Sequence, residues 1–175
     1  MSTVVDRIEI AQGDITTFKV DAIVNAANQS LLGGGGVDGC IHRKAGPRLL
    51  AKCMTLGGCK TGDAKITSGY NLPAAHVIHT VGPVWHSGEK GEPELLASCY
   101  RRSLEVAIEN GVKTIALPGI STGVYCYPKD QACKIALNTT ADFLNEHREI
   151  ERVTFVCFSQ GDYKMYQEAI SVKKV

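Results

Sequence analysis

The sequence predicts an α/β protein, because short strand-like runs alternate with longer segments of helical periodicity. The predicted strands are rich in β-branched or aromatic residues and cover residues 7–11, 22–25, 77–81, 114–117 and 153–158. Two of them, 22–25 and 114–117, are nearly all apolar rather than alternating. That pattern is typical of central strands that are covered on both faces, so each helix is expected to cover a face of the sheet.

Three helices are predicted from periodicity and from the residues at their ends. Pro93 begins the first helix, and Gly111 stands where its C-terminal cap belongs. Pro128 begins the second, and Asp162 is expected to cap the last. The residues at helical spacing are, in order, Leu96, Cys99, Tyr100, Ser103 and Ala107; Ala132, Ile135, Ala136, Thr139 and Phe143; and Met165, Tyr166, Ala169 and Ile170.

Length and charge set the class of protein. A chain of 175 residues with no repeat and no linker is expected to form a single domain over residues 1–175. The formal net charge of +1 disfavours strong binding to nucleic acid or to an anionic membrane. No run approaches a membrane span, and charged residues interrupt the apolar N-terminus, so a soluble, cytoplasmic protein is expected. Residues 85–93, with glycines among charges, are expected to form a mobile surface loop.

The cysteines and histidines predict neither disulfides nor a metal site. The cysteine count is odd and no pair has C-x-x-C spacing, so reduced and mostly buried thiols are expected at Cys40, Cys53, Cys59, Cys99, Cys126, Cys133 and Cys157. The five histidines lack metal-ligand spacing, so no metal or cofactor is expected. His79 lies within a strand and is expected to be a hydrogen-bonded core or rim residue. Cys40 and Cys126 are candidate nucleophiles by position, but no partner histidine is identifiable.

Two glycine-rich segments, residues 33–39 and 119–125, follow the two central strands. The carboxyl ends of such strands gather at one edge of the sheet, where ligands bind. A backbone without bulky side chains can approach a ligand and turn its N–H groups toward a phosphate. Two such loops suit a pyrophosphate, and four consecutive glycines at 33–36 are more than one tight turn requires.

Two nucleotide-binding motifs fit these segments poorly. A P-loop is excluded because the chain contains no Gly-Lys dipeptide. Residues 34–39 match G-x-G-x-x-G, but residues 26–32 separate them from the preceding strand. Asp63, moreover, precedes its strand instead of ending it, so a dinucleotide oxidoreductase is disfavoured.

A serine hydrolase is the rival interpretation. Residues 119–123 match the G-x-S-x-G nucleophile elbow around Ser121, and Asp142 and His147 follow in the order of an α/β-hydrolase triad. Residues 123–127, however, resemble an extended loop rather than the start of a helix, and His147 ends an amphipathic helix. This alternative predicts covalent labelling by a fluorophosphonate.

Four segments together resemble the ligand loops of a macrodomain: residues 12–15, 24–28, 33–39 and 120–125. Residues 40–47 and 77–83 resemble the MacroD-type branch, which includes bacterial O-acetyl-ADP-ribose deacetylases. The resemblance implies a three-layer α/β/α sandwich with a mixed central sheet. It also implies a monomeric, cofactor-free hydrolase that deacetylates O-acetyl-ADP-ribose and removes mono-ADP-ribose esterified to acidic side chains of proteins.

The resemblance assigns a part of ADP-ribose to each loop. Asp14 is expected to accept a hydrogen bond from the adenine amino group, with the Ile15 backbone beside it, and Phe158 to pack on the adenine face. Gly36 and Val37 are expected to lie on one side of the phosphates. On the other side, the phosphates are expected to be bound by the backbone N–H groups of Ser121, Thr122, Gly123, Val124 and Tyr125.

In the same resemblance, Asn28 and Asp38 face the distal ribose, and the ring of Tyr125 shapes the pocket around it. Asn28 fixes the sugar, and Asp38 either acts as general base or mainly orients the ribose. From the residues alone, Asn28 could simply form a turn and Asp38 could cap the following helix. Cys126 stands where the family usually has glycine, which costs strain if the φ there is positive.

A module that binds ADP-ribose without turnover is a further alternative. The combination of Asn28 with the Gly-Val-Asp-Gly run at residues 36–39 favours the hydrolase.

Overall fold

The computed structural model describes residues 3–173, and its six strands form one sheet in the order β1-β6-β5-β2-β4-β3. All neighbouring strands are parallel except β3 and β4, which are antiparallel. The sheet is therefore mixed, as the resemblance implies. The strands are β1 (Ile8–Gln12), β2 (Ala22–Ala27), β3 (Ala64–Ser68), β4 (His76–Val81), β5 (Thr114–Leu117) and β6 (Arg152–Cys157).

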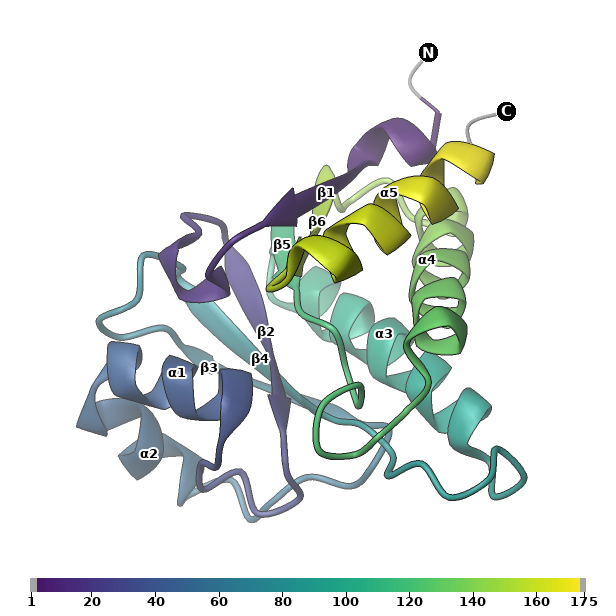
Figure 1. The fold of residues 1–175 in the computed structure, drawn as a ribbon. Helices are drawn as coiled ribbons and strands as arrows, with labels where there is room; N and C mark the ends of the chain where they lie inside the picture. The colour runs from purple at the N-terminus through teal and green to yellow at the C-terminus, as the bar shows by residue number, and fades with distance from the viewer. Residues whose placement is uncertain (1–2, 174–175) are drawn as a thin grey trace.

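Helices cover both faces of the sheet, which gives three layers (Figure 1). Successive side chains of β2 point to opposite faces of the sheet and so belong to two parts of the core. Ile23 packs with helices α1 (Gly36–Ala45) and α2 (Pro47–Cys53). The next residue, Val24, packs on the other face with α3 (Glu92–Glu109), α4 (Lys129–Glu146) and α5 (Gln160–Lys173). The predicted α/β/α class is thus confirmed. Two short 3-10 turns, η1 (Val5–Arg7) and η2 (Ile15–Thr17), flank β1.

The predicted elements are present with small shifts at their ends. The five predicted strands correspond to β1, β2, β4, β5 and β6, whereas the bounds of β3, α1 and α2 were not predicted. The expected cap of α5 is wrong: the Oγ of Ser159 accepts a hydrogen bond from the N–H of Asp162 at 3.1 Å. The helix begins earlier, at Gln160, so the carboxylate of Asp162 lies in its first turn, where it pairs with Lys129.

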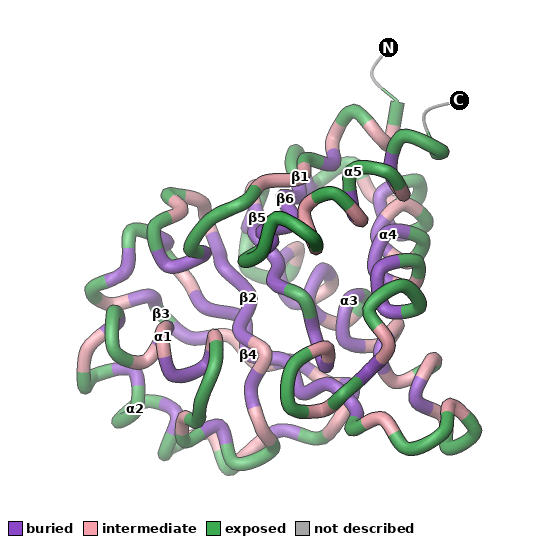
Figure 2. The backbone as a smooth tube through the Cα atoms, in the orientation of Figure 1, coloured by how far each residue is buried: buried purple, intermediate pink, exposed green. Residues whose placement is uncertain are grey.

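Strands β2 and β5 lie at the centre of the sheet, as predicted. Ile23, Ile115 and Ala116 are fully buried, and Figure 2 shows the middle of the sheet as buried backbone. The exception to this apolar pattern is Asn25 on β2, which is also fully buried. A buried polar residue in a central strand needs a hydrogen-bonding reason, which the site supplies.

The cysteines are free, as expected, and five of the seven are buried. Burial raises the pKa of Cys99 to about 11 and the pKa of Cys133 to about 11, so these thiols stay protonated at neutral pH. Cys40 is half-buried and Cys126 is exposed.

The loop before α3 is organised around one buried carboxylate, that of Glu92. Its oxygens accept hydrogen bonds from the N–H groups of His86, Ser87, Gly88 and Lys90 at 2.6–3.1 Å. Burial raises the pKa of Glu92, but these backbone hydrogen bonds lower it more, so the net pKa lies far below its ordinary value of 4.5. The ionised carboxylate therefore holds the loop together.

We expect Glu92→Gln to lower the melting temperature by several degrees at pH 7, because an amide N–H₂ group would face backbone donors. A carboxyl whose pKa is depressed on folding stabilises the fold above its ordinary pKa and loses that contribution as the pH falls. The difference between wild type and variant should accordingly narrow below about pH 4.5. Thermal melts from pH 7 to pH 3 measure it, with the exposed Glu89→Gln as control. A difference that widens in acid would contradict the assignment.

Candidate functional site

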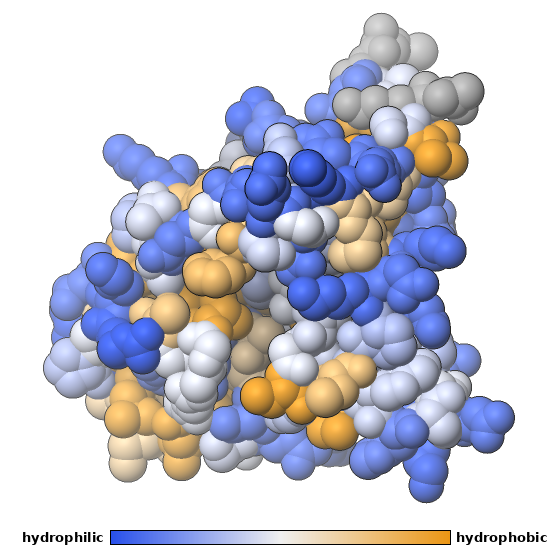
Figure 3. All heavy atoms as spheres, in the orientation of Figure 1, coloured by the Kyte–Doolittle hydropathy of each residue, from blue (hydrophilic) through white to orange (hydrophobic). Residues whose placement is uncertain are grey.

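Five parallel strands end at one edge of the sheet, and the segments that follow four neighbouring ones surround a hollow. These four strands are β1, β6, β5 and β2, which are neighbours in that order. Both glycine-rich segments lie at this edge, since they follow β2 and β5. Figure 3 shows the edge hollowed between the segment ahead of α1 and the loop after β5, with apolar side chains along the floor.

The first glycine-rich segment leads directly into α1. Gly36 has φ +58, which favours glycine, and it begins the helix. A Cβ on Gly39 would lie 2.5 Å from the carbonyl oxygen of Gly34, so the close approach of these two backbones requires glycine. No hydrogen bond among the described residues uses the N–H groups of residues 33–38. Unpaired N–H groups at a helix N-terminus attract anions.

The second glycine-rich segment is a loop that closes on itself by hydrogen bonds. The N–H of Tyr127 donates to the carbonyl of Ser121, and the N–H of Cys126 donates to that of Gly123, both at 2.9 Å. The N–H groups of residues 121–125 make no hydrogen bond within the described chain. Val124 at the tip is 93% exposed. Two loops with unpaired N–H groups thus flank one hollow, which suits a diphosphate.

Asn28 and Asp38 converge on the first loop. A Cβ on Gly34 would lie 3.2 Å from Asp38 Oδ2 and 3.4 Å from Asn28 Nδ2, so both side chains reach the same point of the backbone. Asp38 is 4% exposed, and its Oδ1 accepts a hydrogen bond of 2.9 Å from Asn25 Nδ2. Oδ1 is thereby fixed, and Oδ2 is the oxygen on the side of Gly34.

Sequence reasoning missed the two residues that contact Asp38. Asn25 holds its Oδ1, and His42 Nε2 lies 3.5 Å from the same oxygen, which is long for a hydrogen bond. The signals were present in the sequence, since Asn25 is the polar residue of a central strand and His42 follows Asp38 by four positions on one helix.

The geometry decides the two structural roles that the residues alone left open, a turn at Asn28 and a helix cap at Asp38. Asn28 does form a turn, because its Oδ1 accepts the N–H groups of Ser30 and Leu31 at 3.1 and 3.2 Å. Its Nδ2 donates to the carbonyl of Gly33 at 2.9 Å, which leaves a second amide hydrogen for a ligand. The capping role of Asp38 is wrong: Gly35 is the N-cap residue of α1, and Asp38 lies inside the first turn.

The opposite end of the edge carries an exposed aromatic and a carboxylate. The N–H of Gly13 donates to the carbonyl of Cys157 at 3.0 Å, which brings the Asp14–Ile15 turn beside Phe158. Phe158 is 89% exposed, whereas Ile15 is buried. The hydroxyl and N–H of Thr16 donate to Asp14 and lower its pKa below the ordinary value of 3.8, so Asp14 is an ionised acceptor. An exposed ring beside an acceptor suits a nucleobase.

Cys126 has φ +60, the left-handed conformation that favours glycine. Its thiol is exposed and donates to the carbonyl of Val124 at 3.5 Å, so little compensates for the strain.

Cys126→Gly should therefore stabilise the protein. Relief of the left-handed strain exceeds the extra backbone entropy of glycine by about 0.5–1 kcal/mol, or about 1–4 °C in melting temperature. Cys126→Ala, which keeps the Cβ, serves as the control and should show no such rise. Equal melting temperatures for Gly and Ala would show that the strain is absent.

The residues of the rival serine-hydrolase interpretation are not brought together. The buried Oγ of Ser121 has no hydrogen-bond partner among the described residues. Tyr127 contacts Ser121, but His147 follows the far end of α4, which has 18 residues and is about 27 Å long. The His147 ring stacks on Phe143 with centroids 4.2 Å apart. The structure therefore forms no Ser-His-Asp triad here.

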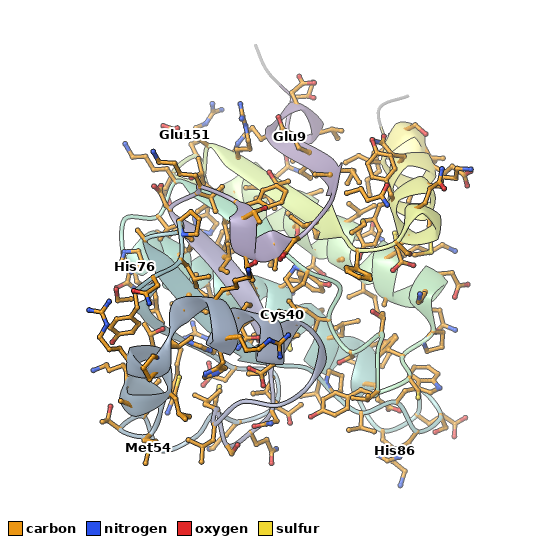
Figure 4. The ribbon with its side chains drawn as sticks, turned by 60° about the vertical axis from the view of Figure 1, so that its left-hand side comes forward. Glu9, Cys40, Met54, His76, His86 and Glu151 are labelled. Atoms are coloured by element: carbon orange, nitrogen blue, oxygen red, sulfur yellow. The ribbon has the colours of Figure 1, made fainter. Side chains whose placement is uncertain are left out.

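The candidate cysteine nucleophiles also lack a histidine partner in the described part of the chain. Cys40 lies on α1, where Figure 4 labels it, and its Sγ accepts a hydrogen bond from Arg43 Nη2 at 3.1 Å. Cys126 contacts only the Val124 carbonyl by hydrogen bonding.

Within residues 3–173, no three His, Cys, Asp or Glu side chains gather as metal ligands. No helix in that range has the length and apolar character needed to cross a membrane.

The fold and the two backbone loops define an α/β domain whose unpaired N–H groups at the carboxyl ends of the strands suit a phosphate-containing ligand. The family model of the Macro domain matches residues 24–136, and the chain belongs to the macro domain family.

The comparisons with individual proteins agree with the family. The chain is 54% identical over 168 residues to ADP-ribose glycohydrolase MACROD2 of Xenopus laevis, covering 95% of this chain and 40% of that protein. It is 53% identical over 167 residues to O-acetyl-ADP-ribose deacetylase of Klebsiella pneumoniae, covering 93% and 95% of the two chains. A crystal structure of the Trypanosoma brucei macrodomain in complex with ADP-ribose superimposes with a TM-score of 0.91 at 46% identity, covering 97% and 72%.

Proposed function

We propose that this chain binds ADP-ribose and hydrolyses esters at its distal ribose. It would deacetylate O-acetyl-ADP-ribose and remove mono-ADP-ribose esterified to acidic side chains. The observation that carries the proposal is the pair of loops with unpaired N–H groups, with Asn28 and Asp38 converging beside them. The names of the glycohydrolase and deacetylase relatives support the same chemistry.

The ligand is proposed to run along the edge in the order of the strands. Adenine lies over β1 and β6, with its amino group on Asp14 and its face on Phe158. The diphosphate lies at β5 and β2, between the N–H groups of the two loops. The distal ribose then reaches Asn28 and Asp38.

An open hollow of about 450 Å³ adjoins the distal ribose position and has room for an acyl group. Asn28, Ser30, Thr61 and Tyr125 are among the residues that line it, and Val84 adds an apolar wall. An acetyl group needs little of this volume, so the side chain of a modified protein also fits there. This is the basis for proposing both free and protein-linked esters as substrates.

In the proposed mechanism, Asp38 Oδ2 accepts a proton from a water molecule. The water oxygen forms a bond to the acyl carbon, or to the anomeric carbon when the linkage is at that position, and the ester C–O bond breaks. The proton passes from Asp38 to the leaving oxygen, which restores the carboxylate. Asn25 keeps Oδ1 in place, and Asn28 orients the sugar for attack. The loop N–H groups bind phosphate throughout and take no part in proton transfer.

Calorimetry with ADP-ribose and a deacetylation assay on the purified chain test the proposal together. Binding with turnover supports the hydrolase. Binding without turnover of any ester would instead favour a module that only binds ADP-ribose, and absence of binding would overturn the ligand assignment. We further propose that the chain acts as a monomer in the cytoplasm; light scattering checks the first point and cell fractionation the second.

A further inference from the structure

A row of buried polar side chains crosses three strands beneath α1 and α2. Asn25 on β2 lies directly beside His79 on β4, and Thr67 on β3 lies diagonally beyond it. Asn25 and His79 are fully buried, and Thr67 is 4% exposed. The row begins at Asp38, whose Oδ1 accepts a hydrogen bond from the Asn25 amide. Three polar residues in one buried layer need a reason beyond packing.

The hydrogen bonds of this row fix the tautomer of His79. Asn25 Nδ2 lies 2.9 Å from Asp38 Oδ1 and 3.2 Å from His79 Nδ1. A carboxylate only accepts hydrogen bonds, so the Asn25 group that faces Asp38 must be the amide N–H₂. That group donates both of its hydrogens, and His79 Nδ1 must therefore accept. The ring hydrogen is left on Nε2, which lies 3.0 Å from Thr67 Oγ1 and donates to it.

The His79 ring is neutral, as this arrangement requires. Burial, with a smaller contribution from His42, lowers the pKa of His79 to about 3. A neutral ring has one donor and one acceptor nitrogen, and the Asn25 amide that donates to Nδ1 determines that Nε2 carries the hydrogen.

The arrangement carries a cost that packing alone would avoid. Asn25 Oδ1 is buried and has no hydrogen-bond partner among the described residues. Rotating the amide by half a turn would put this oxygen against the Asp38 carboxylate, which is repulsive. The amide therefore stays in the orientation that His79 and Asp38 impose, even though its oxygen is left unpaired.

We propose that His79 and Thr67 are positioning residues, which hold Asp38 in its reactive orientation through Asn25. Thr67 accepts the Nε2 hydrogen and so holds the His79 ring, His79 Nδ1 holds the Asn25 amide, and the amide fixes Asp38 Oδ1 so that Oδ2 faces the ribose. The proposal rests on the role proposed above for Asp38. It adds two residues that touch neither the ligand site nor Asp38 directly.

Paired variants at each position test the chain of contacts. His79→Leu removes the acceptor, whereas His79→Asn places an amide oxygen near the position of Nδ1. We expect His79→Leu to lower kcat on the order of 10-fold while the ADP-ribose Kd changes less than about 2-fold, because only the reacting carboxylate is misplaced. His79→Asn should recover most of the lost kcat. Likewise, Thr67→Val should lower kcat and Thr67→Ser should not.

Thr80→Val is the matched control for loss of a buried hydroxyl. Thr80 follows His79 on β4, is fully buried, and donates to the carbonyl of Asp63 at 2.8 Å, away from Asn25. Thr80→Val is expected to lower the melting temperature but not kcat. If it lowers kcat as much as Thr67→Val does, or if His79→Leu turns over like the wild type, the positioning role is wrong.

Nitrogen NMR of the imidazole ring reads the tautomer without any turnover. The inference requires a protonated Nε2 and an unprotonated Nδ1 on His79 in the wild type, and a proton on Nδ1 would overturn it. Because this measurement needs no substrate, it separates failure of the hydrogen-bond row from failure of the proposed hydrolase function. Wild-type protein with the required tautomer and no esterase activity would sink the proposed function and, with it, the catalytic purpose of the row.

Discussion

Asp38→Ala is expected to lower kcat on O-acetyl-ADP-ribose by about 10²-fold or more, the usual scale for removing a general base. The affinity for ADP-ribose should change much less, because the diphosphate and adenine contacts lie on other loops. Steady-state kinetics and calorimetry on the same preparations measure the two effects. The predicted separation of kcat from affinity follows from the position of Oδ2, which lies on the side of Gly34 and Asn28.

Two further variants identify the cause of the expected loss of kcat. Asp38→Asn keeps the shape and can still accept the Asn25 hydrogen bond, but it cannot take a proton, so it should be as slow as Asp38→Ala. Asn28→Ala should weaken binding as well as turnover, since Asn28 holds the loop and the sugar in the ground state and the transition state alike. Normal turnover by Asp38→Ala would transfer the role of base to a phosphate oxygen of the substrate.

Gly123→Glu is expected to weaken ADP-ribose binding by about 10²-fold or more, because its carboxylate would stand against the diphosphate. Gly123 is exposed, its φ is not in the left-handed range, and nothing lies within 4 Å of an added Cβ. The fold should therefore tolerate the substitution, so a loss of affinity reports on the ligand and not on folding. Calorimetry gives the affinity, and a thermal melt verifies the fold.

Gly123→Gln separates charge from bulk. A side chain of the same size without charge should weaken binding much less than Glu does, and the difference should shrink at high salt because screening reduces repulsion. Unchanged affinity in Gly123→Glu would place the diphosphate away from the loop after β5.

The sequence itself determined the fold class, the central strands and the two loops at the sheet edge. Strand and helix periodicity are local properties, so residues 22–25 and 114–117 identify β2 and β5 without any knowledge of their partners. Pro93 and Pro128 mark the starts of α3 and α4 for the same reason. The glycines at 33–36 and 119 likewise show where the backbone can approach a ligand. The positive φ of Cys126 was anticipated only as a condition, because one residue type does not fix its own dihedral angle.

Only the tertiary structure decided which polar groups meet. His79 is 54 positions from Asn25 and 12 positions from Thr67 in the sequence. The three residues form one row because β2, β4 and β3 are adjacent in the sheet and have a particular register. Glu92 gathers four backbone N–H groups only once the preceding loop has folded around it. The capping cue at Asp162 was misleading, since Ser159 was equally suitable and the packing of α5 selected it. Local patterns report the preference of one element, whereas a hydrogen bond between strands depends on strand order and register, which non-local packing sets.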